Sequence, residues 1–489
     1  MPARCLPALL SLALAACSLR AAAQDPLPPP VLQALVQAGL PEDALAAVAL
    51  PLGHWGRPWG HRAQVPMQPG STMKLLTSIV ALDRLGPDLR GHTELRSAAP
   101  LQGGVLQGDL VLQGGADPEL GVPQLWALLL DLRQRGVQHI AGDLLLDRTL
   151  FRPARFDLGL PPFDETPEFA YNVIPDALYL AGNLLPLELA SDAQGARAST
   201  VPPLPGLQVS SRMVPSNTRC PDWDEDWKPA LVQHDAGTTR IELQGAFPRD
   251  CTRRVGLQLI DRNELAERLF RQLWQGLGGS WTGRVIEAPA PAGAALLARR
   301  EARPWGEVLR HLNKTSDNAQ ARLLYLLLGV PAMAANPQAT TFELAERVVR
   351  GWLAEHGIAD AGLVLDNGSG LSRSERISPW QMARSLQVAW AGRYASDLLM
   401  SLPTAGEDGT MRRRLKDSPA AGRARLKTGT LGNVVGLAGV VHDARGQPWA
   451  VAMMINHASA SRGRPVLDAL VDHIARGGPH PPFDPHAAP

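Results

Sequence analysis

Ser71 and Lys74 are the first residues in the sequence whose types and spacing could carry out chemistry. They stand three positions apart in Ser71-Thr72-Met73-Lys74, and on a helix this spacing puts both side chains on one face, with Cβ atoms ~5–6 Å apart. A serine hydroxyl is a weak nucleophile until a base takes its proton. A lysine can be that base when burial lowers its pKa. The pair therefore predicts acyl transfer through a serine.

The triplet Ser316-Asp317-Asn318 is the second candidate. We expect it at the head of a helix, with Lys314 two residues earlier. In that position the Ser316 hydroxyl can relay a proton, and the Asn318 side chain can hold an amide of the substrate. We assign Lys314 no role beyond local charge.

The third candidate is Lys427-Thr428-Gly429, on a predicted strand and followed by Thr430. The ammonium of Lys427 can bind a carboxylate, and the Thr428 hydroxyl can hydrogen-bond it. Gly429 lets a substrate backbone approach the strand. The backbone N–H groups of Ser71, at a helix N-terminus, and of Thr430 are candidate donors to a tetrahedral oxyanion.

The three motifs carry more weight together than separately. By chance, Ser-x-x-Lys is expected about 0.2 times in a chain of this composition and Lys-Thr-Gly about 0.02 times. Here they occur in order and use two of the only five lysines among 48 basic residues. The 12 histidines show no triad spacing around Ser71, which disfavours a Ser-His-Asp hydrolase.

Hydrophobic patterns predict the elements that must position these residues. Segment 71–85 is apolar on most sides and stops at Gly86-Pro87, which indicates a buried helix. An apolar run at 44–52 could be a strand. The remaining helices are predicted at 304–312, 318–328, 341–356 and 463–476, and the strands of a meander at 424–430, 434–441 and 449–456.

Between about residues 93 and 291 the pattern changes. Short alternating stretches separated by Gly and Pro turns predict strands, interrupted by helices near 123–135 and 263–277. The segments before and after this region share a pattern of helices and antiparallel strands. We therefore predict an α+β domain that is split by a β-rich insertion.

Composition excludes several classes of protein. The chain has 489 residues, which is a length of about three domains. Its formal net charge is +1, so it lacks the basic excess that nucleic-acid binding needs. No cysteine stands near a histidine in a metal-ligand spacing and no HExxH is present. We therefore expect neither a metal nor a cofactor.

The N-terminus predicts export. Arg4, the apolar residues 6–16 and the small residues 21–23 form the pattern of a signal peptide over 1–23. The segment 14–17 also resembles a lipoprotein box, which would put a lipid anchor on Cys17, and both alternatives stay open. In an exported chain the two remaining thiols, Cys220 and Cys251, most often pair, although two free thiols remain possible.

The motifs together resemble those of the class C, low-molecular-mass penicillin-binding proteins, the D-alanyl-D-alanine carboxypeptidase/endopeptidase family (peptidase family S13). The resemblance extends over nearly all of the mature chain, through residues 114–118, 142–143, 366–373, 401–406 and 408–412. It implies a split transpeptidase-like domain, with an antiparallel sheet flanked by helices, that carries an insert of two further domains. The boundaries are predicted at 24–95 and 297–480 for the split domain, 96–296 for the insert, about 165–258 for its inner subdomain, and 481–489 for a disordered tail.

The resemblance also implies a role for each motif. Ser71 would be the acylated nucleophile, Lys74 its base and Ser316 part of the proton relay. The N–H groups of Ser71 and Thr430 would form the oxyanion hole. The residues implied to bind the substrate are Asn318, Lys427, Thr428 and Gly429. The implied substrates are peptidoglycan stem peptides in the periplasm, cleaved between two D-alanines, and penicillins would acylate Ser71.

Two other functions remain open at this point. A β-lactamase or esterase on the same scaffold would turn over penicillin rapidly, although the insert and the Ser-Asp-Asn triplet argue against it. A non-catalytic cell-wall-binding scaffold would bind peptidoglycan without releasing D-alanine. The sequence leaves open whether carboxypeptidase or endopeptidase activity dominates, the preferred stem-peptide residue, the oligomeric state and the role of the insert.

Overall fold

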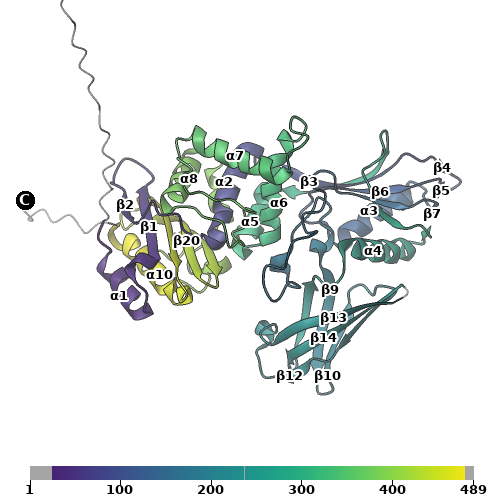
Figure 1. The fold of residues 1–489 in the computed structure, drawn as a ribbon, viewed down its shortest axis with the longest axis horizontal. Helices are drawn as coiled ribbons and strands as arrows, with labels where there is room; N and C mark the ends of the chain where they lie inside the picture. The colour runs from purple at the N-terminus through teal and green to yellow at the C-terminus, as the bar shows by residue number, and fades with distance from the viewer. Residues whose placement is uncertain (1–24, 236, 480–489) are drawn as a thin grey trace, which may run out of the picture.

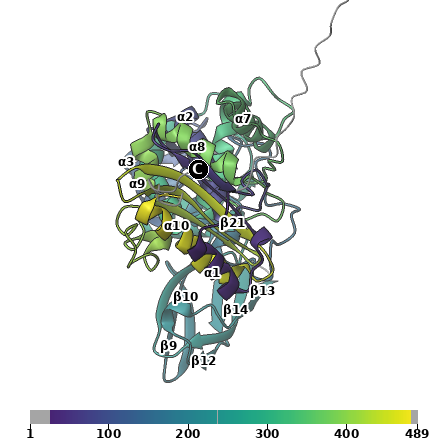
Figure 2. The same ribbon diagram turned by 90° about the vertical axis from the view of Figure 1, so that its left-hand side faces the viewer.

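The structure is a computed structural model that describes residues 25–235 and 237–479. Figure 1 shows an elongated molecule, with a domain of sheet and helices at the left and a strand-rich part at the right. Helices α1 (Pro29–Ala38) and α10 (Arg464–Gly477) pack together, so both ends of the described chain belong to the left-hand domain (Figure 2). The predicted signal peptide, the alternative anchor at Cys17 and the predicted tail lie outside the described residues.

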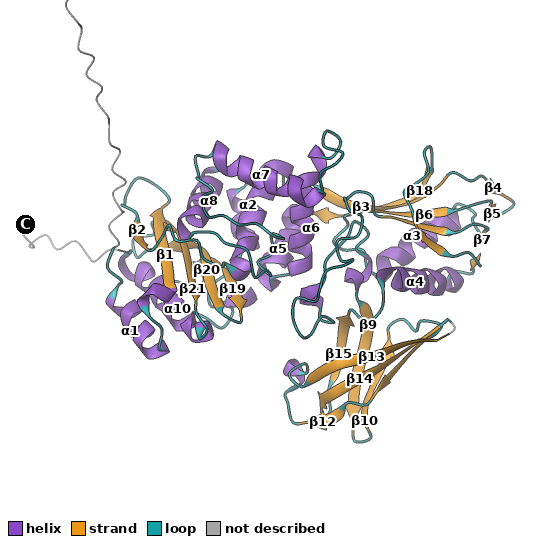
Figure 3. Cartoon of the chain, viewed as in Figure 1, coloured by secondary structure: helices purple, strands orange, loops and turns teal. Residues whose placement is uncertain are grey.

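An antiparallel five-stranded sheet forms the centre of the left-hand domain (Figure 3). Strand β1 is buried along its whole length: Val48 and Leu50 face the core that contains α2 and α8, and Ala47 and Ala49 face the core that contains α1 and α10. Burial on both faces explains the continuous apolar runs in these strands. The strand order is β19 (Arg425–Leu431), β20 (Val434–His442), β21 (Pro448–Asn456), β1 (Leu45–Pro51) and β2 (Trp59–His61).

Helices cover the sheet on the side that faces the middle of the molecule (Figure 1). Every residue of α6 is buried, as are the first ten residues of α2, so side chains at the start of α2 are withdrawn from water. A short 3-10 turn, η2 (Gly70–Thr72), leads into α2. The helices of this layer are α2 (Met73–Leu85), α5 (Trp305–Thr315), α6 (Asn318–Gly329), α7 (Thr341–Glu355), α8 (Pro379–Ala391) and α9 (Ala395–Ser401).

The right-hand part begins and ends on two paired strands, β3 (Arg90–Ser97) and β18 (Ala295–Pro304). They belong to a sheet in the order β17 (Val285–Glu287), β8 (Leu144–Asp147), β6 (Leu110–Gly115), β3 and β18. Helix α3 packs against β18 and against α4. The other elements are α3 (Val122–Gln134), α4 (Arg262–Gly276) and a small sheet of β16 (Ser280–Trp281), β7 (His139–Ile140), β5 (Val105–Leu106) and β4 (Leu101–Gln102).

Two further sheets lie at the lower end of the molecule in Figure 1, between α3 and α4 along the chain. A disulfide joins Cys220 to Cys251 beside them, across a sequence separation of 31 residues. One sheet has the order β10 (Gly195–Thr200), β9 (Leu185–Asp192) and β15 (Thr252–Leu257). In the other, β14 (Thr238–Pro248) pairs with β11 (Leu207–Ser211), β12 (Val214–Ser216) and β13 (Trp227–Asp235).

Most predicted helices and strands lie within one or two residues of the observed ones. Helices α1, α8 and α9 were not predicted; α1 and α8 each begin at or next to a proline, a residue that favours the first helical turn as well as loops. The predicted insert boundaries at 95/96 and 296/297 fall inside β3 and β18, and the domain limits stay a prediction. Within the described residues, no helix is both long and apolar enough to cross a membrane.

Candidate active site

The turn that carries Ser71 is fixed by close backbone packing from two other segments. Gly70 has a φ of +52°, and Ser71 follows it at the start of the η2–α2 helix. A Cβ on Gly370 would lie 1.9 Å from the Gly70 carbonyl oxygen, and a Cβ on Gly429 would lie 2.5 Å from the Pro69 carbonyl oxygen. Glycine is therefore required at both contacts, because they bring the backbone of another segment against the turn.

Lys74 lies one helical turn beyond Ser71 and is fully buried. Its Nζ lies 2.9 Å from Ser71 Oγ, 2.6 Å from Asn318 Oδ1 and 2.5 Å from the Ser369 carbonyl oxygen. The Asn318 amide is oriented by its Nδ2, which donates to the Tyr171 carbonyl at 2.9 Å. Its oxygen is thereby directed at Lys74.

The charge state of Lys74 decides what this cluster can do. Burial lowers its pKa well below the ordinary value and Lys427 lowers it further, while Asp317 and Glu375 act in the opposite direction. A neutral amine has two N–H groups and one lone pair. Since the two carbonyl oxygens can only accept, they take the two N–H groups, and the lone pair is left for the hydroxyl of Ser71. The arrangement can therefore accept the serine proton.

The Ser-Asp-Asn triplet joins α5 to α6. Ser316 adopts the left-handed conformation, with φ +65°, and ends α5. Asp317 caps α6 by accepting a hydrogen bond from the Gln320 N–H at 2.9 Å, so Asn318 begins that helix. The triplet therefore directs Ser316 and Asn318 towards the first motif from the head of a buried helix.

Lys427 is also fully buried, on β19. Its Nζ donates to Ser316 Oγ at 2.8 Å and to its neighbour's carbonyl oxygen, that of Thr428, at 2.9 Å. Burial lowers the pKa of Lys427 to about 7. The Thr428 hydroxyl donates to Thr410 Oγ1 at 2.8 Å. The third motif is thus linked to the second through the Ser316 hydroxyl.

The backbone N–H groups of Ser71 and Thr430 lie on the two sides of the contact between the turn and β19. A Cβ on Gly429 would be 3.1 Å from Ser71 N, and a Cβ on Gly70 would be 3.2 Å from Thr430 N. Two N–H groups at such a contact can both donate to one oxygen atom of a substrate.

A cavity of about 540 Å³ opens above these residues. Ser71, Ser316 and Asn318 line it, while Lys74 and Lys427 are buried beneath. The far wall comes from the loop between β8 and β9 of the strand-rich part. That wall includes Phe163, Asp164, Glu165 and Tyr171.

Comparison with known proteins identifies the family. A model of the D-Ala-D-Ala carboxypeptidase 3 (S13) family matches residues 31–476. The chain belongs to that family.

Two relatives match most of this S13 chain. D-alanyl-D-alanine carboxypeptidase DacB of Haemophilus influenzae is 30% identical over 400 residues, which cover 80% of this chain and 80% of that protein. D-alanyl-D-alanine carboxypeptidase of an Actinomadura species is 30% identical over 424 residues, which cover 84% of this chain and 77% of that protein.

Two solved structures of the Haemophilus influenzae protein are also similar to this chain. The crystal structure of penicillin binding protein 4 (dacB) from Haemophilus influenzae matches with a TM-score of 0.75 at 25% identity, covering 91% of this chain and 99% of that chain. A second structure of that protein, complexed with a β-lactam, gives a TM-score of 0.71 at 24% identity, with the same coverage. These matches confirm the predicted family, the fold class and the enzyme class, a D-Ala-D-Ala carboxypeptidase.

The S13 site also contains groups that sequence reasoning missed. The carbonyl oxygens of Ser369 and Tyr171 contact Lys74 and Asn318, and Thr410 contacts Thr428. A backbone carbonyl has no residue-type signature in a sequence. The available signal for Ser369 was the glycine on either side of it, which indicates a close backbone approach.

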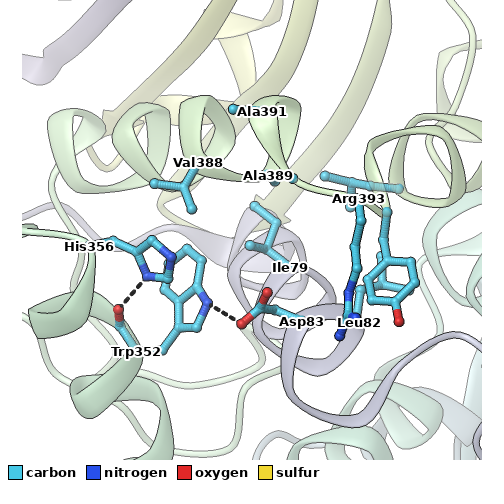
Figure 4. Close-up of a pocket in the computed structure, with 12 residues that line it drawn as sticks. Ile79, Leu82, Asp83, Trp352, His356, Val388, Ala389, Ala391 and Arg393 are labelled. Atoms are coloured by element: carbon cyan, nitrogen blue, oxygen red, sulfur yellow. Dashed lines mark hydrogen bonds between the residues drawn. The ribbon is translucent and has the colours of Figure 1, made fainter.

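A second cavity, of about 380 Å³, lies at the other end of α2 (Figure 4). There Trp352 Nε1 donates to Asp83 Oδ2 at 3.1 Å, and His356 Nδ1 lies 2.8 Å from the Trp352 carbonyl oxygen. The residues that line it belong to none of the three motifs. Of these two cavities, the first is the one around which the motif side chains of this S13 chain gather.

Proposed function

We propose that this S13 chain is a serine-type D-Ala-D-Ala carboxypeptidase and endopeptidase that cleaves peptidoglycan stem peptides through an acyl-enzyme on Ser71. One observation carries the proposal. The hydroxyl of Ser71 lies 2.9 Å from the buried amine of Lys74, and two carbonyl oxygens contact that amine on its other sides. A neutral Lys74 then has its lone pair free for the serine proton.

Acylation begins when Ser71 Oγ attacks the carbonyl carbon between two D-alanines and its proton passes to Lys74 Nζ. The carbonyl oxygen becomes negatively charged and accepts hydrogen bonds from the N–H groups of Ser71 and Thr430. As the tetrahedral intermediate collapses, the C–N bond breaks. The proton that Lys74 accepted then passes through the hydroxyl of Ser316 to the amine of the leaving D-alanine, so Lys74 is neutral again.

The remaining motif residues hold the substrate. Lys427 and Thr428 bind the terminal carboxylate, Asn318 holds a substrate amide, and Gly429 lets the peptide lie against β19. Water then attacks the ester and gives its proton to Lys74. The bond between the acyl carbon and Ser71 Oγ breaks, and Lys74 returns the proton to that oxygen. When the leaving group is the amine of a cross-bridge, the same steps give endopeptidase action and remodel the cell wall.

Penicillins acylate Ser71 in this proposal, and the β-lactam complex of the Haemophilus influenzae protein supports it. Fluorescent penicillin should label the wild type and leave Ser71→Ala unlabelled. Ser78→Ala, two turns further along the same helix, is the matched control and should be labelled. Equal labelling of Ser71→Ala would refute the assignment, and rapid penicillin turnover would indicate a β-lactamase.

The proposed location is the periplasm, because the N-terminal 23 residues have the pattern of a signal peptide. Processing after Ala23 and lipidation at Cys17 remain the two alternatives. The mass of the mature N-terminus distinguishes them: a chain that starts at Gln24 shows plain cleavage, and a diacylglyceryl group on Cys17 shows an anchor.

A further inference from the structure

Glu375 is a buried carboxylate that the mechanism above does not use. Its side chain is fully buried, 0% exposed. Its Oε1 accepts three backbone N–H groups in succession, from Asp366 at 3.3 Å, Asn367 at 3.0 Å and Gly368 at 2.9 Å. Its Oε2 has no hydrogen-bond partner. Burying a carboxylate costs free energy unless hydrogen bonds compensate for the lost water. The three N–H groups supply that compensation and tie Glu375 to the backbone of residues 366–368.

The loop that Glu375 holds, residues 366–370, contacts the η2–α2 helix through three successive residues, Gly368, Ser369 and Gly370. The Gly368 carbonyl accepts from Thr77 Oγ1 at 2.7 Å, and the Ser369 carbonyl accepts from Lys74 at 2.5 Å. A Cβ on Gly370, whose φ is +82°, would lie 1.9 Å from the Gly70 carbonyl oxygen. The position of this loop therefore decides where one of the two carbonyl acceptors of Lys74 lies.

We propose that Glu375 is a positioning residue of the acylation step: its carboxylate fixes the 366–370 loop so that the Ser369 carbonyl engages Lys74 and directs the amine's lone pair at Ser71. The inference rests on the proposed function, in which Lys74 is the base. Without that carbonyl, a neutral Lys74 could turn an N–H towards Ser71, and an N–H cannot accept the serine proton.

The charge of Glu375 has a second, separable effect. Its three N–H donors favour the ionised form although burial raises its pKa. The ionised carboxylate raises the pKa of Lys74, so it opposes the neutral amine that acylation needs. Other charges act on the same pair. Lys427 and Arg322 lower the pKa of Lys74 and Asp317 raises it, while Asp366 raises the pKa of Glu375. Glu375 in turn raises the pKa of Arg322 and of Tyr325.

Two variants separate position from charge. Glu375→Gln keeps one carbonyl oxygen for the three N–H groups and removes the charge, whereas Glu375→Ala removes the anchor altogether. The measurement is the second-order rate of acylation of the full chain by fluorescent penicillin, from mildly acidic to alkaline pH. We expect Glu375→Ala to lower the maximal rate by about tenfold or more, because the base is misplaced. We expect Glu375→Gln to stay within about threefold of the wild-type maximum, while its acid limb moves to lower pH by about half a unit or more.

Asp443→Asn is the matched control. Asp443 is 4% exposed and also holds a loop, by accepting the N–H groups of Arg445 and Gln447 at 2.9 Å each. That loop joins β20 to β21, seven residues and about 23 Å along the strand from the partner of Gly429. The variant should lower the melting temperature and leave both the maximal rate and the acid limb unchanged.

The outcomes distinguish this inference from the function on which it rests. An acid limb that stays at the wild-type pH in Glu375→Gln overturns the charge effect, and a maximal rate that falls tenfold or more in folded Glu375→Gln overturns the positioning role, even if Glu375→Ala fails to fold. A wild-type maximal rate in folded Glu375→Ala also overturns the positioning role. In each case an unlabelled Ser71→Ala leaves the proposed function standing. A labelled Ser71→Ala overturns the function and the inference together.

Discussion

Gly429→Ala tests the contact on which the oxyanion donors depend. A Cβ at this position would lie 2.5 Å from the Pro69 carbonyl oxygen, and 3.4 Å is an ordinary contact. The variant therefore has to move β19 and the Ser71 turn apart by about 0.9 Å. The two proposed oxyanion donors, the N–H groups of Ser71 and Thr430, lie on opposite sides of that contact, so this movement pulls them apart.

The expected loss follows from that displacement. A misplacement of about 1 Å costs about 10²-fold in rate, and the loss of one oxyanion donor costs about 10²- to 10³-fold. We therefore expect the rate of acylation by penicillin to fall about 10²-fold, which corresponds to about 2.7 kcal/mol of transition-state stabilisation. The measurement is stopped-flow acylation, with the melting temperature recorded on the same sample.

Gly351→Ala is the matched control for this prediction. Gly351 lies on the exposed side of α7, and a Cβ there would meet no atom within 4 Å. It should acylate at the wild-type rate. The reasoning is refuted if Gly429→Ala acylates within about threefold of the wild type, or if Gly351→Ala loses as much activity as Gly429→Ala.

Two further predictions follow from the buried charges and from the disulfide. The rate of acylation should give a bell-shaped pH profile. Lys74 must lose its proton to act as the base, which sets the acid limb, and Lys427 must keep its proton to bind a carboxylate, so the rate falls again as pH rises through the Lys427 pKa of about 7. A rate that rises throughout the alkaline range would contradict this. Replacing Cys220 and Cys251 by serine should lower the free energy of unfolding by about 3–4 kcal/mol and leave the acylation rate unchanged. If denaturant unfolding shows that the free energy of unfolding falls by less than about 1 kcal/mol, this prediction is wrong.

The sequence predicted the site as far as residue type reveals chemistry. Ser71, Lys74, Ser316 and Lys427 stand out because a nucleophile, a base and a carboxylate-binding group need those side chains, and the structure brings them around one cavity. The burial of α2 could also be predicted, since its residues are apolar on most sides.

The groups that complete the site could not be found in this way. The Ser369 and Tyr171 carbonyls act through the backbone, and their places depend on loops whose conformations are set by tertiary contacts. Glu375 lies six residues from Ser369 and resembles any surface glutamate in the sequence, although it is fully buried. The wall that contains Phe163 and Asp164 comes from the loop between β8 and β9 of the strand-rich part, for which the sequence predicted no role in the site.

In the proposed mechanism the two buried lysines need opposite charge states, and the repulsion between them helps to set their pKa values apart. Lys427 lowers the pKa of Lys74, so a proton on Lys427 favours the neutral form of Lys74. In the proposed mechanism a substrate carboxylate binds beside Lys427, and a nearby negative charge stabilises the ammonium form of this lysine. Binding of the substrate therefore keeps Lys427 charged at a pH where burial alone would let it lose its proton, and that charge keeps Lys74 ready to act as the base.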